Sequence, residues 1–213
     1  MIYTASHKNI NSKLYRAYAI SGNRGSDASW EGMCYPALAP KKEFFKIWHD
    51  NIGKISEEEN TKYYINEYYK QVLSKLDPYK VYNELDNSIL LCYEDGIEFC
   101  HRHIVRAWFK LFLQADIKEI KSIGYATTEY LESPDYTDIL ENVIKENNNM
   151  RVFNSIRAWY LFMESEALEQ EADYLEAKNG KDYSYLRQSA CFRRCDADEA
   201  EAEYNIKQKR LNK

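Results

Sequence analysis

The run Ser88–Tyr93 constrains the fold of this chain more than any other segment. It reads Ser-Ile-Leu-Leu-Cys-Tyr, with no alternation of polar and apolar residues. Such a run is typical of a strand buried on both faces of a parallel sheet. The shorter runs 2–5 and 15–20 also favour strands, and helical patterns lie between the three. The sequence therefore predicts an α/β fold, with a small, mostly parallel sheet flanked by helices.

Capping residues locate the helices of the first half. Ser56, with Glu59 three residues later, forms a capping box for a helix to about residue 76. Asp77 and Pro78 supply the N-cap and first residue of a second helix, which runs through residue 85. In the second half we expect only helices, over residues 134–146, 151–178 and 183–211. We therefore divide the chain into an α/β domain, 1–115, and an all-helical extension, 116–213.

Charge and composition exclude several classes of protein. The net charge is −5, and it arises in the second half: residues 1–115 carry 15 Lys and Arg against 14 Asp and Glu, residues 116–213 carry 14 against 20. This balance argues against sequence-independent coating of DNA, which requires a basic surface. We find no transmembrane run and no secretory signal, and we expect a cytoplasmic protein. The five cysteines then favour free thiols over a disulfide framework.

Polar segments follow each of the three predicted strands. Ser6 comes after the first strand, Ser21–Gly25 after the second, and Glu94–Arg102 after the third. If the strands are parallel, these segments meet at the sheet edge where open α/β sheets bind ligands. Glycines such as Gly25 let a backbone approach a ligand closely, and Arg24 can pair with a phosphate or carboxylate. We expect a ligand site at this edge.

Cys100 lies in the first turn of a helix whose apolar residues form one stripe. The partial positive charge at a helix N-terminus binds anions and lowers the pKa of a cysteine, so Cys100 can be a thiolate nucleophile or part of an anion site. It can equally be a small apolar residue of the core. Cys92, Cys100 and His101 or His103 could instead bind zinc, but their spacing matches no standard zinc module, and we assign no metal ligand. Cys100 to Arg106 also has the spacing of a phosphotyrosine phosphatase loop, without its glycines.

With these motifs in view, residues 1–113 resemble the domain of unknown function 488 (DUF488) family. The resemblance follows the chain in order, from the opening Ile-Tyr-Thr to the segments that carry its most specific motifs: Tyr35–Pro40, Leu73–Pro78, Leu91–Glu94 and Phe99–His103. It implies a site formed by Cys92, Glu94, Cys100, His101 and Arg102, with Arg24 contributing from the earlier loop. It identifies no reaction, and the helical second half resembles no family.

Two functional hypotheses remain open. In the first, the chain is an enzyme for a phosphorylated or nucleotide-like ligand, free or within a nucleic acid. Cys100, His101 and Glu94 then perform the chemistry, and the ligand is bound by Ser6, Ser21, Arg24, Gly25 and Arg102. In the second, the chain is a non-catalytic module whose acidic helical half binds a protein partner or a second copy of itself. The sequence assigns no cofactor and no membrane partner.

Overall fold

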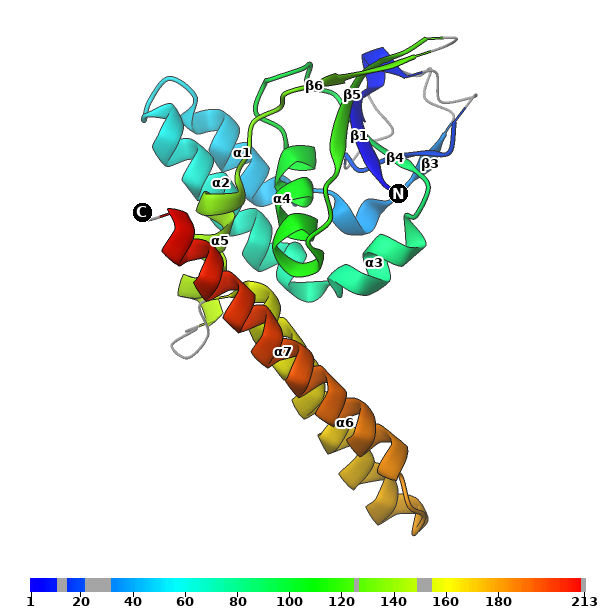
Figure 1. The fold of residues 1–213 in the computed structure, drawn as a ribbon. Coiled ribbons are helices and arrows are strands. Elements are labelled where there is room, and N and C mark those ends of the chain that lie inside the picture. Colours follow the sequence, from blue (N-terminus) through cyan, green and yellow to red (C-terminus); the bar gives the residue numbers. More distant parts are fainter. Residues whose placement is uncertain (11–14, 22–31, 125–126, 149–154, 212–213) are drawn as a thin grey trace. The chain divides into compact units, whose positions relative to one another are not determined.

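The computed structural model describes residues 1–10, 15–21, 32–124, 127–148 and 155–211 of the chain. It contains two compact units, residues 1–147 and residues 148–213. Figure 1 shows the first unit as a sheet with helices and the second as two long helices. No helix in the described ranges is both long and apolar enough to cross a bilayer.

A six-stranded sheet forms the centre of the first unit. Its order is β3-β2-β4-β1-β5-β6, and all neighbours are parallel except β5 and β6. This confirms the prediction of a small, mostly parallel sheet. The three strands expected from the sequence are β1, β2 and β4. The bounds of all six are β1 (Tyr3–Ser6), β2 (Ala17–Ala19), β3 (Met33–Cys34), β4 (Ile89–Cys92), β5 (Lys118–Ile123) and β6 (Thr128–Leu131).

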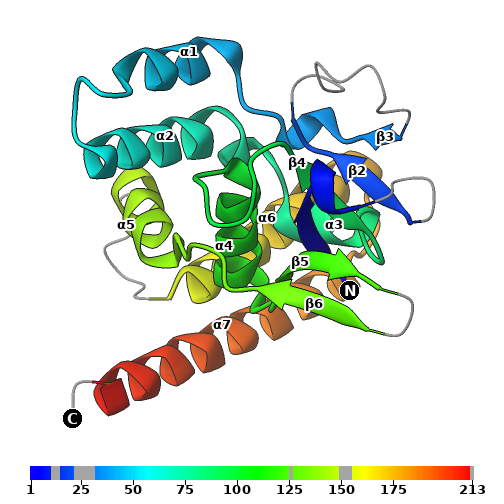
Figure 2. The same cartoon turned by 90° about the horizontal axis from the view of Figure 1, so that it is seen from above.

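Two helices of this unit, α2 and α3, begin where the capping residues predict, whereas the helix expected from residue 134 begins at Thr137. The Ser56 side chain accepts a hydrogen bond from the Glu59 N–H, and Glu59 reaches back to the Ser56 N–H. Asp77 caps the helix that starts at Pro78. In Figure 2, α1 and α2 lie side by side. The bounds are α1 (Lys42–Asn51), α2 (Glu57–Gln71), α3 (Pro78–Glu84), α4 (His101–Leu113) and α5 (Thr137–Asn148).

The two faces of the sheet carry different residues. One face holds a cluster of small and branched apolar side chains: Ala5, Ile10, Ala17, Ile89, Leu91 and Ile120. Because successive side chains of a strand alternate, Leu90 and Cys92 point to the opposite face, as does Glu119. Helix α4 packs on that face, since its Arg102 contacts Glu119. The alternation therefore directs the last residue of β4 toward the first turn of α4.

Residues 116–147 differ from the all-helical expectation for the second half. They form β5, β6 and α5, and the compact unit extends beyond the expected boundary at residue 115. The reason lies in the apolar pattern: Ile117, Ile120 and Ile123 are three residues apart, which is typical of a helix rather than a strand. Parallel pairing of β5 with β1 overrides this local pattern.

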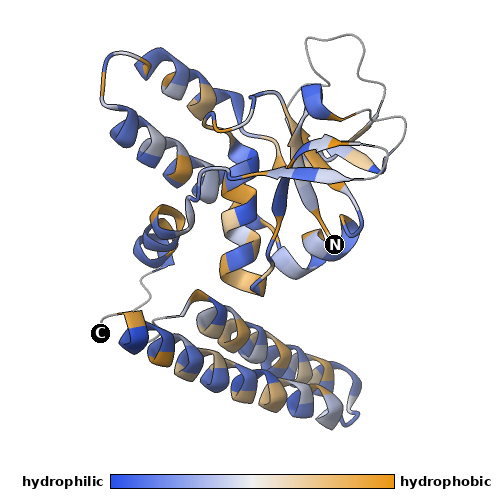
Figure 3. Ribbon diagram, turned by 45° about the horizontal axis from the view of Figure 1, so that its top comes forward, coloured by the Kyte–Doolittle hydropathy of each residue, from blue (hydrophilic) through white to orange (hydrophobic). Residues whose placement is uncertain are grey.

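The second unit is an antiparallel helical hairpin, so the predicted all-helical C-terminal part is confirmed for residues 156–211. Helix α6 (Ile156–Asn179) ends at Gly180, whose φ of 63° is left-handed, and α7 (Ser184–Leu211) follows. The expected start of α6 at Arg151 lies outside the described residues. Both helices carry interspersed polar and apolar residues, as Figure 3 shows.

Small residues at seven-residue spacing form the seam of this hairpin. Ala158, Ser165 and Ala172 are buried on α6, and Ala190 and Ala197 are buried on α7. Side chains this small let two helix backbones approach closely. Ion pairs flank the seam, because Arg194 lies 2.7 Å from both Glu166 and Glu169, and Arg187 contacts Asp173 and Glu176. Close packing and these ion pairs hold α6 against α7.

We predict that Ala197→Leu lowers the free energy of unfolding by about 1–3 kcal/mol, because the seam has no room for the added atoms. Urea unfolding followed by far-ultraviolet circular dichroism of the full chain measures this. Ala202→Leu is the control, since Ala202 is exposed on the same helix. Equal stability of the two variants would contradict the packed seam.

Candidate functional site

The loop between β4 and α4 brings the end of β4 and the start of α4 together. Strand β4 ends at Cys92, and Cys100 is the N-cap residue of α4. The intervening turn includes Gly96, whose φ is 49°, and the Glu98 N–H donates to the Asp95 carbonyl at 3.0 Å. Arg102 of α4 donates to the Gly96 carbonyl at 3.3 Å, which ties the turn to the helix. Cys92 and Cys100 are therefore neighbours in space.

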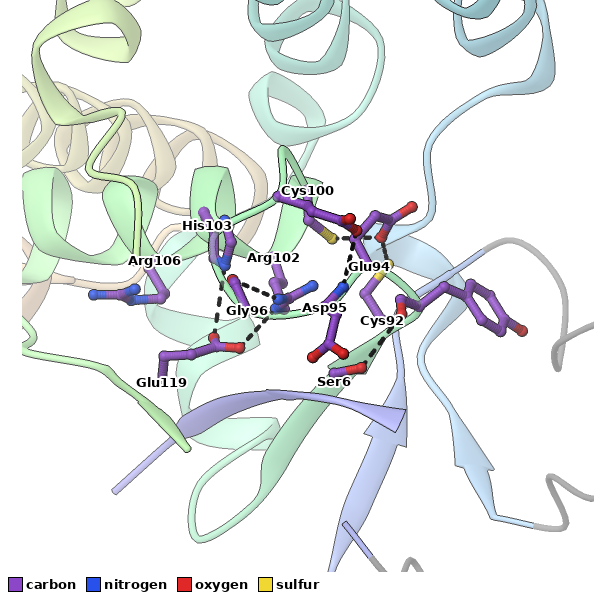
Figure 4. Close-up of polar contacts among 12 residues, drawn as sticks. Ser6, Cys92, Glu94, Asp95, Gly96, Cys100, Arg102, His103, Arg106 and Glu119 are labelled. Carbon is purple, nitrogen blue, oxygen red and sulfur yellow. Dashed lines mark hydrogen bonds and ion pairs between the residues drawn. The ribbon is translucent and has the colours of Figure 1, made fainter. Parts of the chain in front are cut away.

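Four side chains converge there, as Figure 4 shows for Cys92, Glu94 and Cys100. Glu94 Oε2 lies 3.0 Å from Cys92 Sγ and 2.9 Å from Cys100 Sγ. His101 Nδ1 lies 3.5 Å from Cys92 Sγ and 3.9 Å from Cys100 Sγ. The structure thus brings together the predicted residues Glu94, Cys100 and His101. We refer to Cys92, Glu94, Cys100 and His101 as the thiol cluster.

The orientation of His101 is set by the backbone. Its Nε2 lies 3.0 Å from the Ile20 carbonyl oxygen. Because a carbonyl only accepts, Nε2 carries a hydrogen and donates it, and Nδ1 faces the sulfur atoms. The ring of Tyr68 also packs edge-on against the imidazole, with 5.7 Å between centroids. The end of β2 and helix α2 together hold the imidazole in place.

The four side chains of the thiol cluster shift one another's pKa values in different directions. Burial opposes a thiolate at Cys100, but hydrogen bonds from Cys92 and His101 outweigh it and lower the pKa of Cys100 to about 6. Burial and the adjacent Cys100 raise the pKa of Cys92. Burial also opposes charge on Glu94 and His101, yet the neighbouring sulfur atoms lower the pKa of Glu94 and raise that of His101. The cluster therefore favours one thiolate beside one thiol.

A cavity of about 180 Å³ opens beside the cluster. This is smaller than the roughly 300–1,000 Å³ of sites for drug-sized ligands. Cys100 is absent from its wall, although it contacts Glu94 and His101, which line it. Lys42, in the first turn of α1, brings a positive charge to the wall. The wall consists of Ser21, Pro40, Lys42, Phe45, Cys92, Tyr93, Glu94 and His101.

Arg102 does not face this cavity. It is fully buried, and its Nε donates to Glu119 Oε1 at 3.0 Å. His103 Nε2 lies 3.8 Å from the other oxygen of Glu119. Burial, together with the guanidinium groups of Arg102 and Arg106, lowers the pKa of His103 to about 2, so this imidazole is neutral. Arg102, Glu119 and His103 therefore form a buried polar group that supports the loop between β4 and α4.

The predicted site residues that remain are Ser6, Ser21, Arg24 and Gly25. Ser6 lies at the sheet edge as expected, where its hydroxyl donates to the Tyr93 carbonyl at 3.3 Å. Ser21 lines the cavity. Arg24 and Gly25 lie outside the described residues. Residues 101–105 are helical and Arg106 Nε donates to the Ile117 carbonyl at 2.8 Å, so this segment forms no phosphatase loop.

A comparison with known families finds a match over the segment that carries the thiol cluster. The model of the DUF488-N3a family, described as the active DUF488-N3 subclade, matches residues 6–112. The chain belongs to the DUF488 family. No curated protein and no solved structure matches it significantly.

Two residues of this DUF488 protein were not identified from the sequence. Lys42 reaches the cavity from α1, some 50 residues before the cluster, and its only signal is a position two residues after Pro40. Glu119 lies beyond the DUF488 match, on strand β5, whose isoleucines have a spacing typical of a helix. The signal available in the sequence was a charged residue between isoleucines. A charge buried among apolar residues needs a partner.

We predict that Glu119→Gln lowers the free energy of unfolding by roughly 3–5 kcal/mol, because it leaves the buried Arg102 charge without compensation. Urea unfolding measures this change. The matched control is Glu129→Gln on β6, whose ion pair with Lys121 is exposed and contributes about 0–1 kcal/mol. The double variant Arg102→Met/Glu119→Leu should recover much of the loss. A Glu119→Gln protein as stable as the control would contradict the supporting role.

Proposed function

We propose that this DUF488 protein is a cytoplasmic enzyme that acts on a small phosphorylated or nucleotide-like molecule, free or within a nucleic acid. One observation carries the proposal: three side chains of the thiol cluster, Cys92, Glu94 and His101, line the same cavity as Lys42. Reactive groups with perturbed pKa values beside a cavity are typical of catalytic sites. The description of the matching DUF488 subclade as active supports catalysis.

The character of the cavity supports an anionic ligand. Lys42 supplies a charge, and Lys42 and Phe45 lie in the first turn of α1, where backbone N–H groups favour anions. Ser21 adds a hydroxyl from the end of β2. With about 180 Å³, the cavity fits a phosphate or a sugar phosphate rather than a whole nucleotide. The reacting part of the ligand would enter, and a larger remainder would stay outside.

The positions of the cluster residues suggest their roles. Glu94 has a lowered pKa and lies on the cavity wall, so it is the proton acceptor for a bound ligand. Cys100 and His101 contact each other at 3.9 Å, as a thiolate and an imidazolium that stabilise each other's charge. Arg102 supports the loop instead of binding the ligand.

The test incubates the full chain with inorganic phosphate, ribose 5-phosphate and 5′-AMP, and follows binding and products by phosphorus NMR. Lys42→Ala should weaken binding about 10-fold or more, because it removes a charge-assisted hydrogen bond. Glu94→Gln should lower turnover of the converted compound about 100-fold or more, through loss of the proton acceptor.

Lys41→Ala and Glu43→Gln are the matched controls. Both residues are exposed beside Lys42, and neither lines the cavity. Unchanged binding in Lys42→Ala, or full turnover in Glu94→Gln, would contradict the proposal.

A further inference from the structure

Three residues of the thiol cluster, Cys92, Cys100 and His101, have the composition and spacing of a metal site. Cys92 Sγ, Cys100 Sγ and His101 Nδ1 all lie within 4.8 Å of one another, and all three residues are buried. Glu94 Oε2 lies about equally far from both sulfur atoms, at 3.0 and 2.9 Å. Two sulfur atoms and one imidazole nitrogen are thus close enough together to bind one ion, and the Glu94 carboxylate lies beside the two sulfur atoms.

The distances agree with a tetrahedral ion. Zinc binds sulfur at about 2.3 Å and imidazole nitrogen at about 2.0–2.1 Å, so a sulfur and a nitrogen on one ion lie about 3.5 Å apart. The observed separations from His101 Nδ1 are 3.5 Å to Cys92 Sγ and 3.9 Å to Cys100 Sγ. Only small shifts are needed to place both sulfur atoms and the nitrogen on one ion.

The environment of His101 is a second, independent observation. A metal-binding histidine donates its other ring N–H to a carbonyl or carboxylate, which fixes the tautomer and the ring orientation. His101 does this with Nε2, which donates to the Ile20 carbonyl at 3.0 Å, and its Nδ1 faces the sulfur atoms. The ring orientation therefore suits a metal ion bound at Nδ1.

We propose that Cys92, Cys100 and His101 bind one zinc ion and leave its fourth position to a ligand from the cavity. Two thiolates and an imidazole select zinc over magnesium or calcium, which prefer oxygen ligands. All three residues are buried, and Cys92 and His101 also line the cavity, so a ligand in the cavity can reach the fourth position. A fourth position that can exchange with a ligand distinguishes catalytic zinc sites from structural ones. The inference deepens the proposed function, and it rests on that function only for the catalytic use of the ion.

The test uses cobalt(II) as a spectroscopic substitute for zinc. The full chain is purified without affinity nickel, stripped with a chelator and titrated with Co²⁺. We expect one equivalent of Co²⁺ to bind with sulfur-to-cobalt charge-transfer bands and the intense visible bands of a tetrahedral site. One equivalent of Zn²⁺ should abolish both sets of bands.

Variants identify the ligands. Cys92→Ser and Cys100→Ser should remove or halve the charge-transfer bands, whereas Cys34→Ser, outside the cluster, should keep them. Glu94→Gln preserves the shape of a half-buried residue that lies beside both sulfur atoms, and it should keep the charge-transfer bands. Co²⁺ binding without charge-transfer bands, or bands unchanged in Cys92→Ser and Cys100→Ser, would overturn the proposal.

The zinc site and the proposed function can fail separately. Phosphate binding that depends on Lys42, in a protein without tetrahedral Co²⁺ binding, would overturn the zinc site alone. Tetrahedral Co²⁺ binding in a protein that neither binds nor converts the phosphorylated probes would support the zinc site and overturn the proposed function.

Discussion

The buried ion pair between Arg102 and Glu119 is the interaction on which the site depends. It joins α4 to β5, and through the Gly96 carbonyl it also holds the turn that follows β4. Burying two charges is costly unless they pair well, so this contact favours one register of α4 on the sheet. That register places Cys100 beside Cys92 and directs His101 toward the end of β2.

Much of the fold and part of the site could be predicted from the sequence. The apolar run ending at Cys92 indicated a central parallel strand, and the strand ends indicated the sheet edge where Glu94, Cys100 and His101 meet. Arg102 was expected to bind a ligand because its partner, Glu119, lies on a strand with helix-like spacing of isoleucines. Lys42 could not be found, because only the tertiary structure brings the start of α1 to this edge.

The thiol cluster illustrates how a loop creates chemistry that spacing alone does not reveal. Cys92 and Cys100 are eight residues apart, which matches no standard zinc module, but the turn at Gly96 reverses the chain between them. A strand end and a helix start thus supply ligands at one point. Beside them, Glu94 and Lys42 give the cavity one group that accepts a proton and one that attracts an anion.

The convergence of two thiols and one imidazole is the central claim, and X-ray absorption at the zinc edge tests it most directly. The measurement uses the full chain loaded with one equivalent of zinc. We predict two sulfur atoms at about 2.3 Å and two nitrogen or oxygen atoms at about 2.0–2.2 Å. A shell of nitrogen and oxygen atoms alone, or one with a single sulfur atom, would contradict this account.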